Sequence, residues 1–259
     1  MVFRWILLWL LALPVQADTL TVAVAANFAS TLDAIRASFE EKSEHTVRVV
    51  LGGTGVLATQ IMRNAPFDVF LAADETRPHM LIEHGYAEAS TSFVYAIGQL
   101  AFWTPGRTDR QPLGYWLAMG GRPIALANPT LAPYGAAAKT VISSELARLE
   151  SDFLSLQRSG QLVLADNVAG AFSMAASGNA VAAFIALSQC LSEGLDESEY
   201  RIVDTQPNIV INQRAVMTRR GLSNPAAVEF MKFLRAPETR ELIKRAGYQL
   251  PPVSKLSHG

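Results

Sequence analysis

The stretch LGGTGVLATQIMRNAPFDVFLAAD, residues 51–74, decides the fold of this chain. Its Gly-Gly-Thr-Gly tetrapeptide at 52–55 predicts a compact turn whose backbone can approach a ligand closely, because three of the four residues lack a Cβ atom. Val56, Leu57 and Ile61 follow at spacings that place them on one face of a short helix. The turn therefore lies at a helix N-terminus, whose unpaired N–H groups and positive dipole end suit an anion.

The segments on either side of this turn alternate between strand and helix. Pro66 ends the helix, and the apolar run 67–73 predicts a buried strand that ends at Asp74. Upstream, the sequence predicts a strand at 19–26, a helix to about Lys42 and a second strand at 47–51. Downstream, Gly85 stops a helix that spans 77–84. Such alternation with short connections favours a doubly wound α/β unit with right-handed crossovers.

A second α/β unit is predicted beyond Phe93. We expect one strand-like run over Tyr95–Trp103 and an irregular segment over Thr108–Gly121, with Trp116 packed beneath it. The remaining predicted elements of this unit are strands at 124–127, 162–165, 180–187 and 200–204 and helices at 138–149 and 169–176.

The alternating run 209–218 predicts a long strand that returns to the first unit. Asn224 and Pro225 then open a helix, and a last helix runs from Pro237 to Gly247. We therefore expect a discontinuous first lobe at 18–95 and 208–250, a second lobe at 96–207 and a polar tail at 251–259.

Residues 1–17 have the pattern of a secretory signal peptide: Arg4, an apolar run and a small-residue end at Ala17. Cleavage there removes one of 22 basic residues and none of 23 acidic ones, which leaves a net charge of −2. This near-neutral balance gives no support for nucleic acid or an anionic membrane as a partner. Cys190 is the single cysteine, so no intrachain disulfide can form, and we expect it to be a buried apolar residue.

Four predicted junctions share one design, in which a buried strand ends, a small or polar residue follows, and a helix begins. They are Ala26-Asn27, 53–55, Tyr134-Gly135 and Asn167-Val168. In open α/β sheets, ligands bind beyond the carboxyl ends of the strands. None of the four junctions carries Lys or Arg, so amides and hydroxyls alone would hold the ligand. That arrangement suits a small, compact anion stripped of water.

The motifs AANFASTLDAI, GGTGVLATQI, APFDVFLAAD and PYG, in this order, resemble the periplasmic molybdate-binding proteins of ABC transporters. The resemblance spans Thr19 to about Tyr248 and implies a two-lobed, type II solute-binding fold of mixed sheets flanked by helices. It implies a periplasmic monomer that captures molybdate or tungstate as a ligand, without a cofactor. The implied partner is an ABC permease in the inner membrane, with no role for nucleic acid.

By this resemblance, the oxyanion contacts are Asn27, Thr54, Tyr134 and Val168, the last two through backbone N–H groups. One departure concerns a tyrosine that many members carry after the strand at 180–185, because Ala186 stands there in this chain. Tyr134 occupies a position where those members carry alanine. We therefore expect its ring to fold over the cleft and to point its hydroxyl at the ligand.

Several alternatives remain open from the sequence. Thr54 and Asn27 could simply cap their helices, and Asp68 and Asp74 are expected to pin loops rather than to form a catalytic pair. No histidine has the spacing of a metal site. A secreted enzyme acting on phosphate or sulfate esters could use the same anion pocket, but catalysis requires an activated nucleophile or a metal. A ligand-sensing domain of a regulator would share the fold, and the export signal speaks against it.

Overall fold

A computed structural model describes residues 17–149, 151–204 and 210–252 of the protein. The predicted signal peptide lies outside the described residues except for Ala17, and so does most of the predicted tail. Within the described ranges, no helix is long and apolar enough to cross a membrane.

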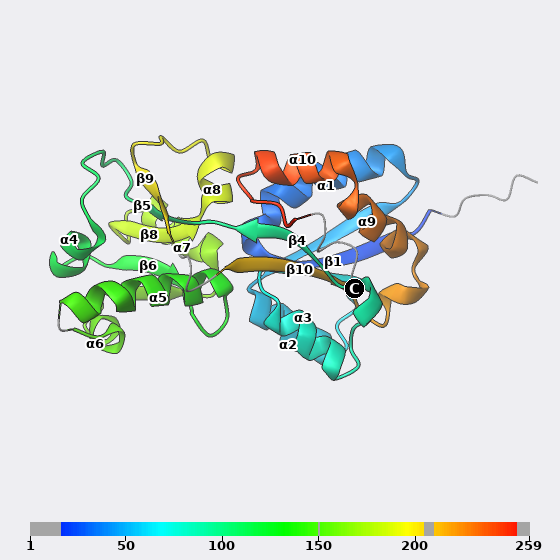
Figure 1. The fold of residues 1–259 in the computed structure, drawn as a ribbon, viewed down its shortest axis with the longest axis horizontal. Coiled ribbons are helices and arrows are strands. Elements are labelled where there is room, and N and C mark those ends of the chain that lie inside the picture. Colours follow the sequence, from blue (N-terminus) through cyan, green and yellow to red (C-terminus); the bar gives the residue numbers. More distant parts are fainter. Residues whose placement is uncertain (1–16, 150, 205–209, 253–259) are drawn as a thin grey trace, which may run out of the picture.

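Two five-stranded sheets, each covered by helices on both faces, form the two lobes of the molecule (Figure 1). The first lobe contains a mixed sheet, in which β1, β2 and β3 are parallel and β10 is antiparallel to both β3 and β4. The order of strands in this sheet is β2 (Thr46–Gly52), β1 (Thr19–Ala25), β3 (Val69–Ala72), β10 (Ile211–Met217) and β4 (Phe93–Gly98).

Successive side chains of β1 point to opposite faces of the sheet and pack in two separate cores. Val22 and Val24 pack with α1 (Ala29–Lys42), α9 (Pro225–Arg235) and α10 (Pro237–Arg245). Ala23 faces the opposite side, where α2 (Thr54–Met62) and α3 (Thr76–Glu83) cover the sheet. The near-continuous apolar sequence of β1 follows from this burial on both faces.

The second lobe repeats this layered design. Its sheet has the order β7 (Leu162–Ala165), β6 (Ile124–Ala127), β8 (Ala182–Ala186), β5 (Leu100–Trp103) and β9 (Tyr200–Val203). One face packs against α4 (Leu113–Ala118), α5 (Pro133–Arg148) and α6 (Phe153–Arg158), and the other against α7 (Val168–Ala176) and α8 (Leu187–Ser192). The fold class expected from the sequence, a two-lobed α/β protein, is confirmed.

The segment predicted as one strand over Tyr95–Trp103 is two strands in two different sheets. The chain leaves the first sheet after Gly98 and enters the second at Leu100. Gln99 lies between them, and its carbonyl oxygen accepts a hydrogen bond from Leu187 N in the second lobe. The sequence did not reveal this crossing, because the apolar run continues through it without interruption. The first sheet therefore includes residues beyond 95, the limit expected for this part of the first lobe.

Other differences concern short helices. The segment Thr108–Gly121 contains α4, which was expected to be irregular, although Trp116 is buried as predicted. The helices α6 and α8 were not expected from the sequence. The predicted return of the chain is confirmed, because β10 pairs with β3 and β4 of the first sheet.

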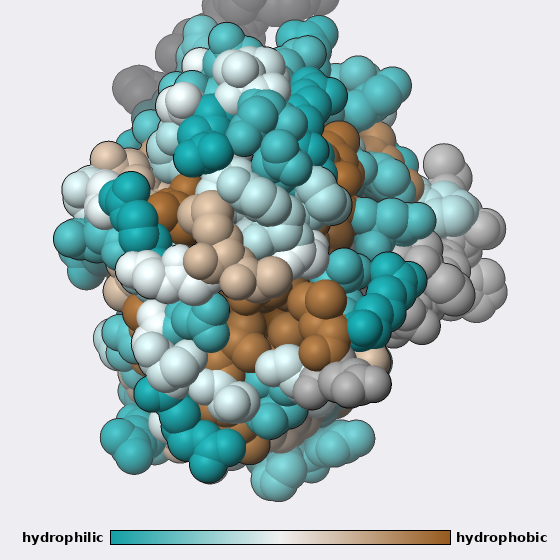
Figure 2. Space-filling model, turned by 90° about the vertical axis from the view of Figure 1, so that its left-hand side faces the viewer, coloured by the Kyte–Doolittle hydropathy of each residue, from teal (hydrophilic) through white to brown (hydrophobic). Residues whose placement is uncertain are grey.

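The end of the second lobe has apolar side chains among polar ones (Figure 2). Exposed large apolar residues in its helices include Tyr115 and Met119 around α4, Leu149 after α5 and Leu154 in α6. These residues lie on the outer helices and not at the junctions that the sequence singles out.

Candidate functional site

A small cavity lies where helix N-termini of the two lobes meet. About 10 Å³ of it is open to the centre of a water-sized sphere, so it has room for little more than one water molecule. All four predicted site residues line this cavity. Its lining consists of Ala25, Ala26, Asn27, Gly52, Gly53, Thr54, Ala73, Ala132, Pro133, Tyr134, Asn167 and Val168.

Thr54 is the first residue of α2 and is buried. Its hydroxyl oxygen accepts a hydrogen bond from Ala73 N at 3.2 Å, which leaves the hydroxyl proton available as a donor. The N-cap of α2 is Gly53, and no side chain caps this helix end. Thr54 is therefore not the cap of its helix, which was the alternative left open by the sequence.

Asn27 lies in the short 3₁₀ turn Ala26–Phe28 between β1 and α1 and is buried. Its Nδ2 donates to Gln213 Oε1 at 3.0 Å and to Tyr248 OH at 3.1 Å. The side chain does not cap α1, which begins after Phe28 without a side-chain cap. Asn27 is instead held by two polar side chains of its own lobe.

Val168 is the first residue of α7, and Asn167 is its N-cap. The Asn167 side chain accepts a hydrogen bond from Gly170 N at 3.1 Å. Val168 has no polar side-chain atom, so its backbone N–H, one of the unpaired donors of a helix start, is the group that it can offer to an anion.

Tyr134 is the second residue of α5 and follows Pro133. Its backbone N–H belongs to the unpaired first turn of a long helix. The side chain is buried, and its hydroxyl oxygen accepts a hydrogen bond from Gln213 Nε2 at 3.2 Å. The ring is therefore buried with its hydroxyl bonded to Gln213, and the expectation that this hydroxyl points at the ligand stays a prediction. Ala186 is also fully buried and is not part of the cavity lining.

The lobes touch each other beside this cavity. Gly55 N donates to Leu131 O at 2.9 Å, and Arg77 Nη2 donates to Thr130 O at 2.8 Å. Both bonds connect the first lobe to the β6–α5 loop of the second. The described structure is therefore a closed arrangement of the two lobes.

Gly53 contributes to this closure through its missing side chain. A Cβ atom at Gly53 would lie 2.9 Å from Asp166 O and 3.5 Å from Leu131 O, both in the second lobe. From the sequence, the glycines of this turn are expected to allow close approach of a ligand. The structure adds a second reason, which is close approach of the opposite lobe.

Electrostatically, the cavity is lined without Lys, Arg, His, Asp or Glu. Burial raises the pKa of Tyr134 and Tyr95 well above that of an exposed tyrosine, and it raises the pKa of Tyr248 to about 12. These hydroxyls therefore stay neutral at physiological pH. An anion in the cavity would meet neutral donors and helix N-termini instead of mobile charges.

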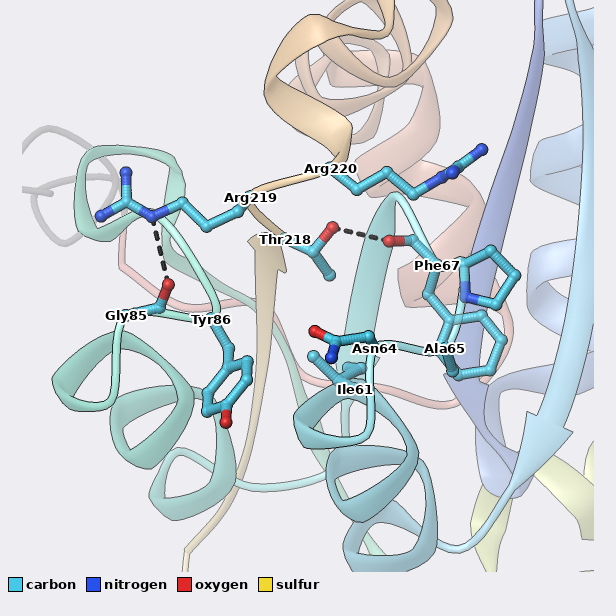
Figure 3. A pocket seen from close by; sticks show the side chains of 10 residues that line it. Ile61, Asn64, Ala65, Phe67, Gly85, Tyr86, Thr218, Arg219 and Arg220 are labelled. Atoms are coloured by element: carbon cyan, nitrogen blue, oxygen red, sulfur yellow. Dashed lines mark hydrogen bonds between the residues drawn. The ribbon is translucent and has the colours of Figure 1, made fainter.

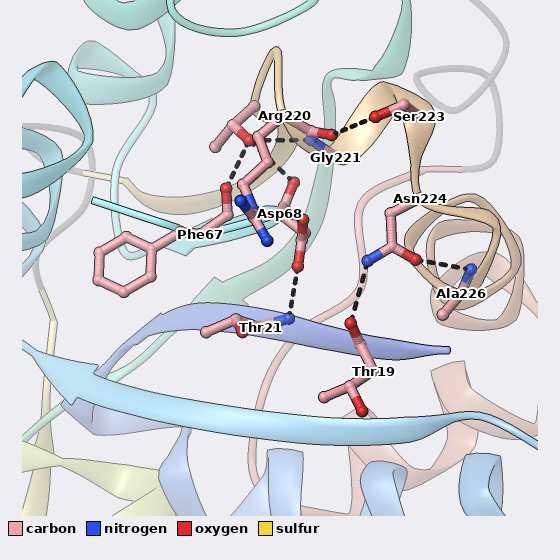
Figure 4. Close-up of polar contacts among 10 residues, drawn as sticks. Thr19, Thr21, Phe67, Asp68, Arg220, Gly221, Ser223, Asn224 and Ala226 are labelled. Carbon is pink, nitrogen blue, oxygen red and sulfur yellow. Dashed lines mark hydrogen bonds and ion pairs between the residues drawn. The ribbon is translucent and has the colours of Figure 1, made fainter. Parts of the chain in front are cut away.

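Asp68 and Asp74 hold neighbouring segments of the chain in place, as expected from the sequence. Asp68 Oδ2 accepts from Thr21 N at 2.7 Å (Figure 4). Its Oδ1 has no hydrogen-bond partner but lies 3.3 Å from Arg220 Nε in an ion pair. Asp74 accepts from Arg77 N at 2.9 Å and forms an ion pair with the Arg77 guanidinium at 2.7 Å. No group of three or more His, Cys, Asp or Glu residues within the described ranges could hold a metal ion.

A larger pocket, of about 460 Å³, lies at the opposite end of the first sheet (Figure 3). It adjoins the C-terminal ends of α2 and α3, near Asn64 and Gly85, where the helix dipole disfavours an anion. Its Arg219 pairs with Glu88 at 3.2 Å, and its Arg220 pairs with Asp68. None of the four predicted site residues lines this pocket.

Comparisons with known proteins agree with this geometry. The family model of the bacterial extracellular solute-binding proteins matches residues 20–249. The molybdate-binding protein ModA of Rhodobacter capsulatus is 38% identical over 240 residues, covering 92% of this chain and 91% of that protein. The ModA of Azotobacter vinelandii is 39% identical over 245 residues, covering 93% of this chain and 94% of that protein.

Solved structures show the same architecture. The periplasmic molybdate-binding protein of Azotobacter vinelandii superimposes with a TM-score of 0.80 at 34% identity, covering 90% of this chain and all of that one. The sulfate-binding protein SubI of Mycobacterium tuberculosis superimposes with a TM-score of 0.74 at 12% identity, covering 92% of this chain and 88% of that one. The second match shows the shared fold alone.

Proposed function

Because this chain belongs to the bacterial extracellular solute-binding proteins, we propose that it captures molybdate or tungstate between its two lobes. The anion is a transported ligand and not a cofactor. We infer further that the protein works in the periplasm as a monomer and delivers the anion to the permease of an ABC transporter. In this proposal Asn27, Thr54, Tyr134 and Val168 contact the anion.

The observation that carries the proposal is a ring of neutral donors at the cavity. Thr54 offers a hydroxyl, and α2, α5 and α7 direct their N-termini to the same point. Oriented amide dipoles stabilise a buried anion without a counter-charged side chain. Two of these helices come from the second lobe and one from the first, so an anion in the cavity stabilises the closed form.

The dimensions of the cavity support a small ligand. A cavity with room for little more than one water-sized sphere suits a small ligand better than drug-sized molecules, whose pockets are commonly ~300–1,000 Å³. Entry requires the lobes to separate, and the chain passes between the two sheets at Gln99 and again ahead of β10. We propose that the boundaries between the two lobes lie at Gln99 and just ahead of β10.

We expect one molybdate or tungstate to bind per chain, with sulfate and phosphate far weaker. A ligand at ~100 times its dissociation constant raises the free energy of unfolding by about 2.7 kcal/mol, which a thermal-shift panel detects. Titration calorimetry then gives the stoichiometry and the order of affinities. Because no mobile cation is paired, affinity should change little with salt. Tighter binding of sulfate than of molybdate would contradict the proposal.

Binding and not catalysis is the proposed activity, in keeping with the relatives named as molybdate-binding proteins. The one described partner of the Thr54 hydroxyl is a backbone N–H, which cannot serve as a general base. Burial raises the pKa of Cys190 to about 12, so its thiol is not an activated nucleophile.

Thr54→Ala is expected to weaken molybdate binding about ten- to hundredfold, since a hydrogen bond to a charged group contributes about 1.5–3 kcal/mol. The backbone donors of the helix N-termini should retain residual binding. Thr54→Ser is the matched control, because it keeps the hydroxyl and should bind within about threefold of the parent. Calorimetry on both variants decides the matter, and equal affinities of Thr54→Ala and the parent would remove Thr54 from the site.

A further inference from the structure

We propose that Gln213 is a positioning residue for oxyanion capture, one that sets the direction of hydrogen bonding at Asn27 and Tyr134. The inference rests on the proposed function. Gln213 lies in β10, outside the cavity lining, and its side chain is fully buried. A fully buried amide in a central strand is costly unless each of its polar atoms has a partner.

Both ends of the Gln213 amide are engaged. Its Oε1 accepts hydrogen bonds from Tyr95 OH and from Asn27 Nδ2, each at 3.0 Å. Its Nε2 donates to Tyr134 OH at 3.2 Å. Of these partners only Asn27 Nδ2 cannot accept a hydrogen bond, so the oxygen of the Gln213 amide faces Asn27 and its nitrogen faces Tyr134.

This orientation determines what Tyr134 can offer. Because the Tyr134 oxygen accepts from Gln213, its own proton remains free to be donated to another acceptor. The bond also requires space at Gly98, where a Cβ atom would lie 2.1 Å from the Tyr134 hydroxyl. The amide thus keeps the hydroxyl in a donor role towards an anion.

The same bonds connect the lobes. Gln213 belongs to the first lobe and Tyr134 to the second. Beside them, Ser188 of the second lobe donates to Asn27 O at 2.9 Å, and Tyr248 OH lies 2.7 Å from that carbonyl and 2.9 Å from Ser188 Oγ. The network therefore places the Asn27 junction and the start of α5 in one buried unit, so lobe closure and donor orientation occur together.

The decisive variant is Gln213→Glu, which changes donor direction with almost no change in shape. An ionised carboxylate has no proton for Tyr134, so the Tyr134 hydroxyl would donate to Glu and turn away from the anion. A protonated carboxyl restores one donor and one acceptor. The titratable groups around this position are Tyr95, Tyr134 and Tyr248, all with a raised pKa, so burial without a cationic partner should raise the pKa of the new carboxyl.

We expect Gln213→Glu to bind molybdate at least about a hundredfold more weakly than the parent at pH 9 and within about tenfold of it at pH 6, by calorimetry. Gln60→Glu, an exposed change in α2, adds the same charge to the same lobe and should follow the parent at both pH values. Equal affinity of Gln213→Glu and the parent at both pH values, or an equal loss at both, would overturn the positioning role.

Gln213→Met keeps the side-chain length and removes all directionality, so it tests the inference should the Glu variant not fold. It is expected to weaken binding about tenfold at every pH, and Tyr134→Phe should do the same. Parental affinity in both variants would overturn the inference. Failure of the parent itself to bind molybdate or tungstate would instead overturn the proposed function, so the two outcomes are distinguishable.

Discussion

Gly135→Ala is expected to destabilise the protein by about 3 kcal/mol or more, the upper range for forcing atoms into a packed interior. A Cβ atom at this position would lie 2.1 Å from Ala127 O and 2.9 Å from Asn128 C, both in backbone that cannot rotate away. For a domain of this size the change corresponds to a fall in melting temperature of roughly 6–12 °C. Because Tyr134 precedes the glycine, the same displacement should weaken molybdate binding.

The control for this prediction is Gly114→Ala in α4. There a Cβ atom would meet the end of the Glu145 side chain at 2.6 Å, which can swing aside. Alanine is also a better helix former than glycine. Thermal unfolding should therefore show an unchanged or slightly raised melting temperature for Gly114→Ala. Equal melting temperatures for Gly135→Ala and the parent would show that the β6–α5 turn can adjust.

Gly53→Ala is expected to weaken molybdate binding without lowering the stability of the ligand-free protein. Alanine suits the backbone of Gly53, whose φ is −70°, so each lobe should fold normally. The methyl group would meet Asp166 O of the other lobe at 2.9 Å and would therefore oppose closure. We expect molybdate affinity to fall about ten- to hundredfold, as for the loss of about 1.4–2.8 kcal/mol of closed-state stability. The ligand-free melting temperature should change little.

Stopped-flow tryptophan fluorescence tests this mechanism, because opposition to closure should appear as faster release of molybdate. The larger Gly53→Val should bind still more weakly than Gly53→Ala, in proportion to the added volume. If both variants bind molybdate as tightly as the parent, the loop that contains Asp166 can move aside without a cost in free energy.

Much of the fold could be predicted because the alternation of apolar residues has a simple physical cause. Strands such as Thr19–Ala25 are buried on both faces, and helices such as α1 bury one stripe, so the two periods are visible in the sequence. The crossing at Gln99 could not be seen, since β4 and β5 are equally apolar on either side of it. Short helices such as α6 and α8 bury too few residues to produce a clear period.

The cavity that forms the candidate site was partly predictable for a related reason. Asn27, Thr54, Tyr134 and Val168 follow strand ends, and the topology brings these junctions together at one cavity. Gln213 gave no such signal, because a single glutamine within a strand looks like an exposed residue. Its importance arises from partners that are distant in sequence, and only the folded chain places Tyr95 and Asn27 against it.

The position of β10 has a consequence for the order in which the molecule assembles. β10 lies between β3 and β4, so Ala215 must pair with both Leu71 and Phe93 after the whole second lobe has intervened along the chain. Pairings between such distant segments slow folding, because a long loop must close before they form. Until then, β3 and β4 each present an unpaired edge, which is the usual starting point of aggregation. The strands of the second lobe come from one continuous segment, whereas the first sheet is complete only once β10 is inserted, which also brings Gln213 against Asn27.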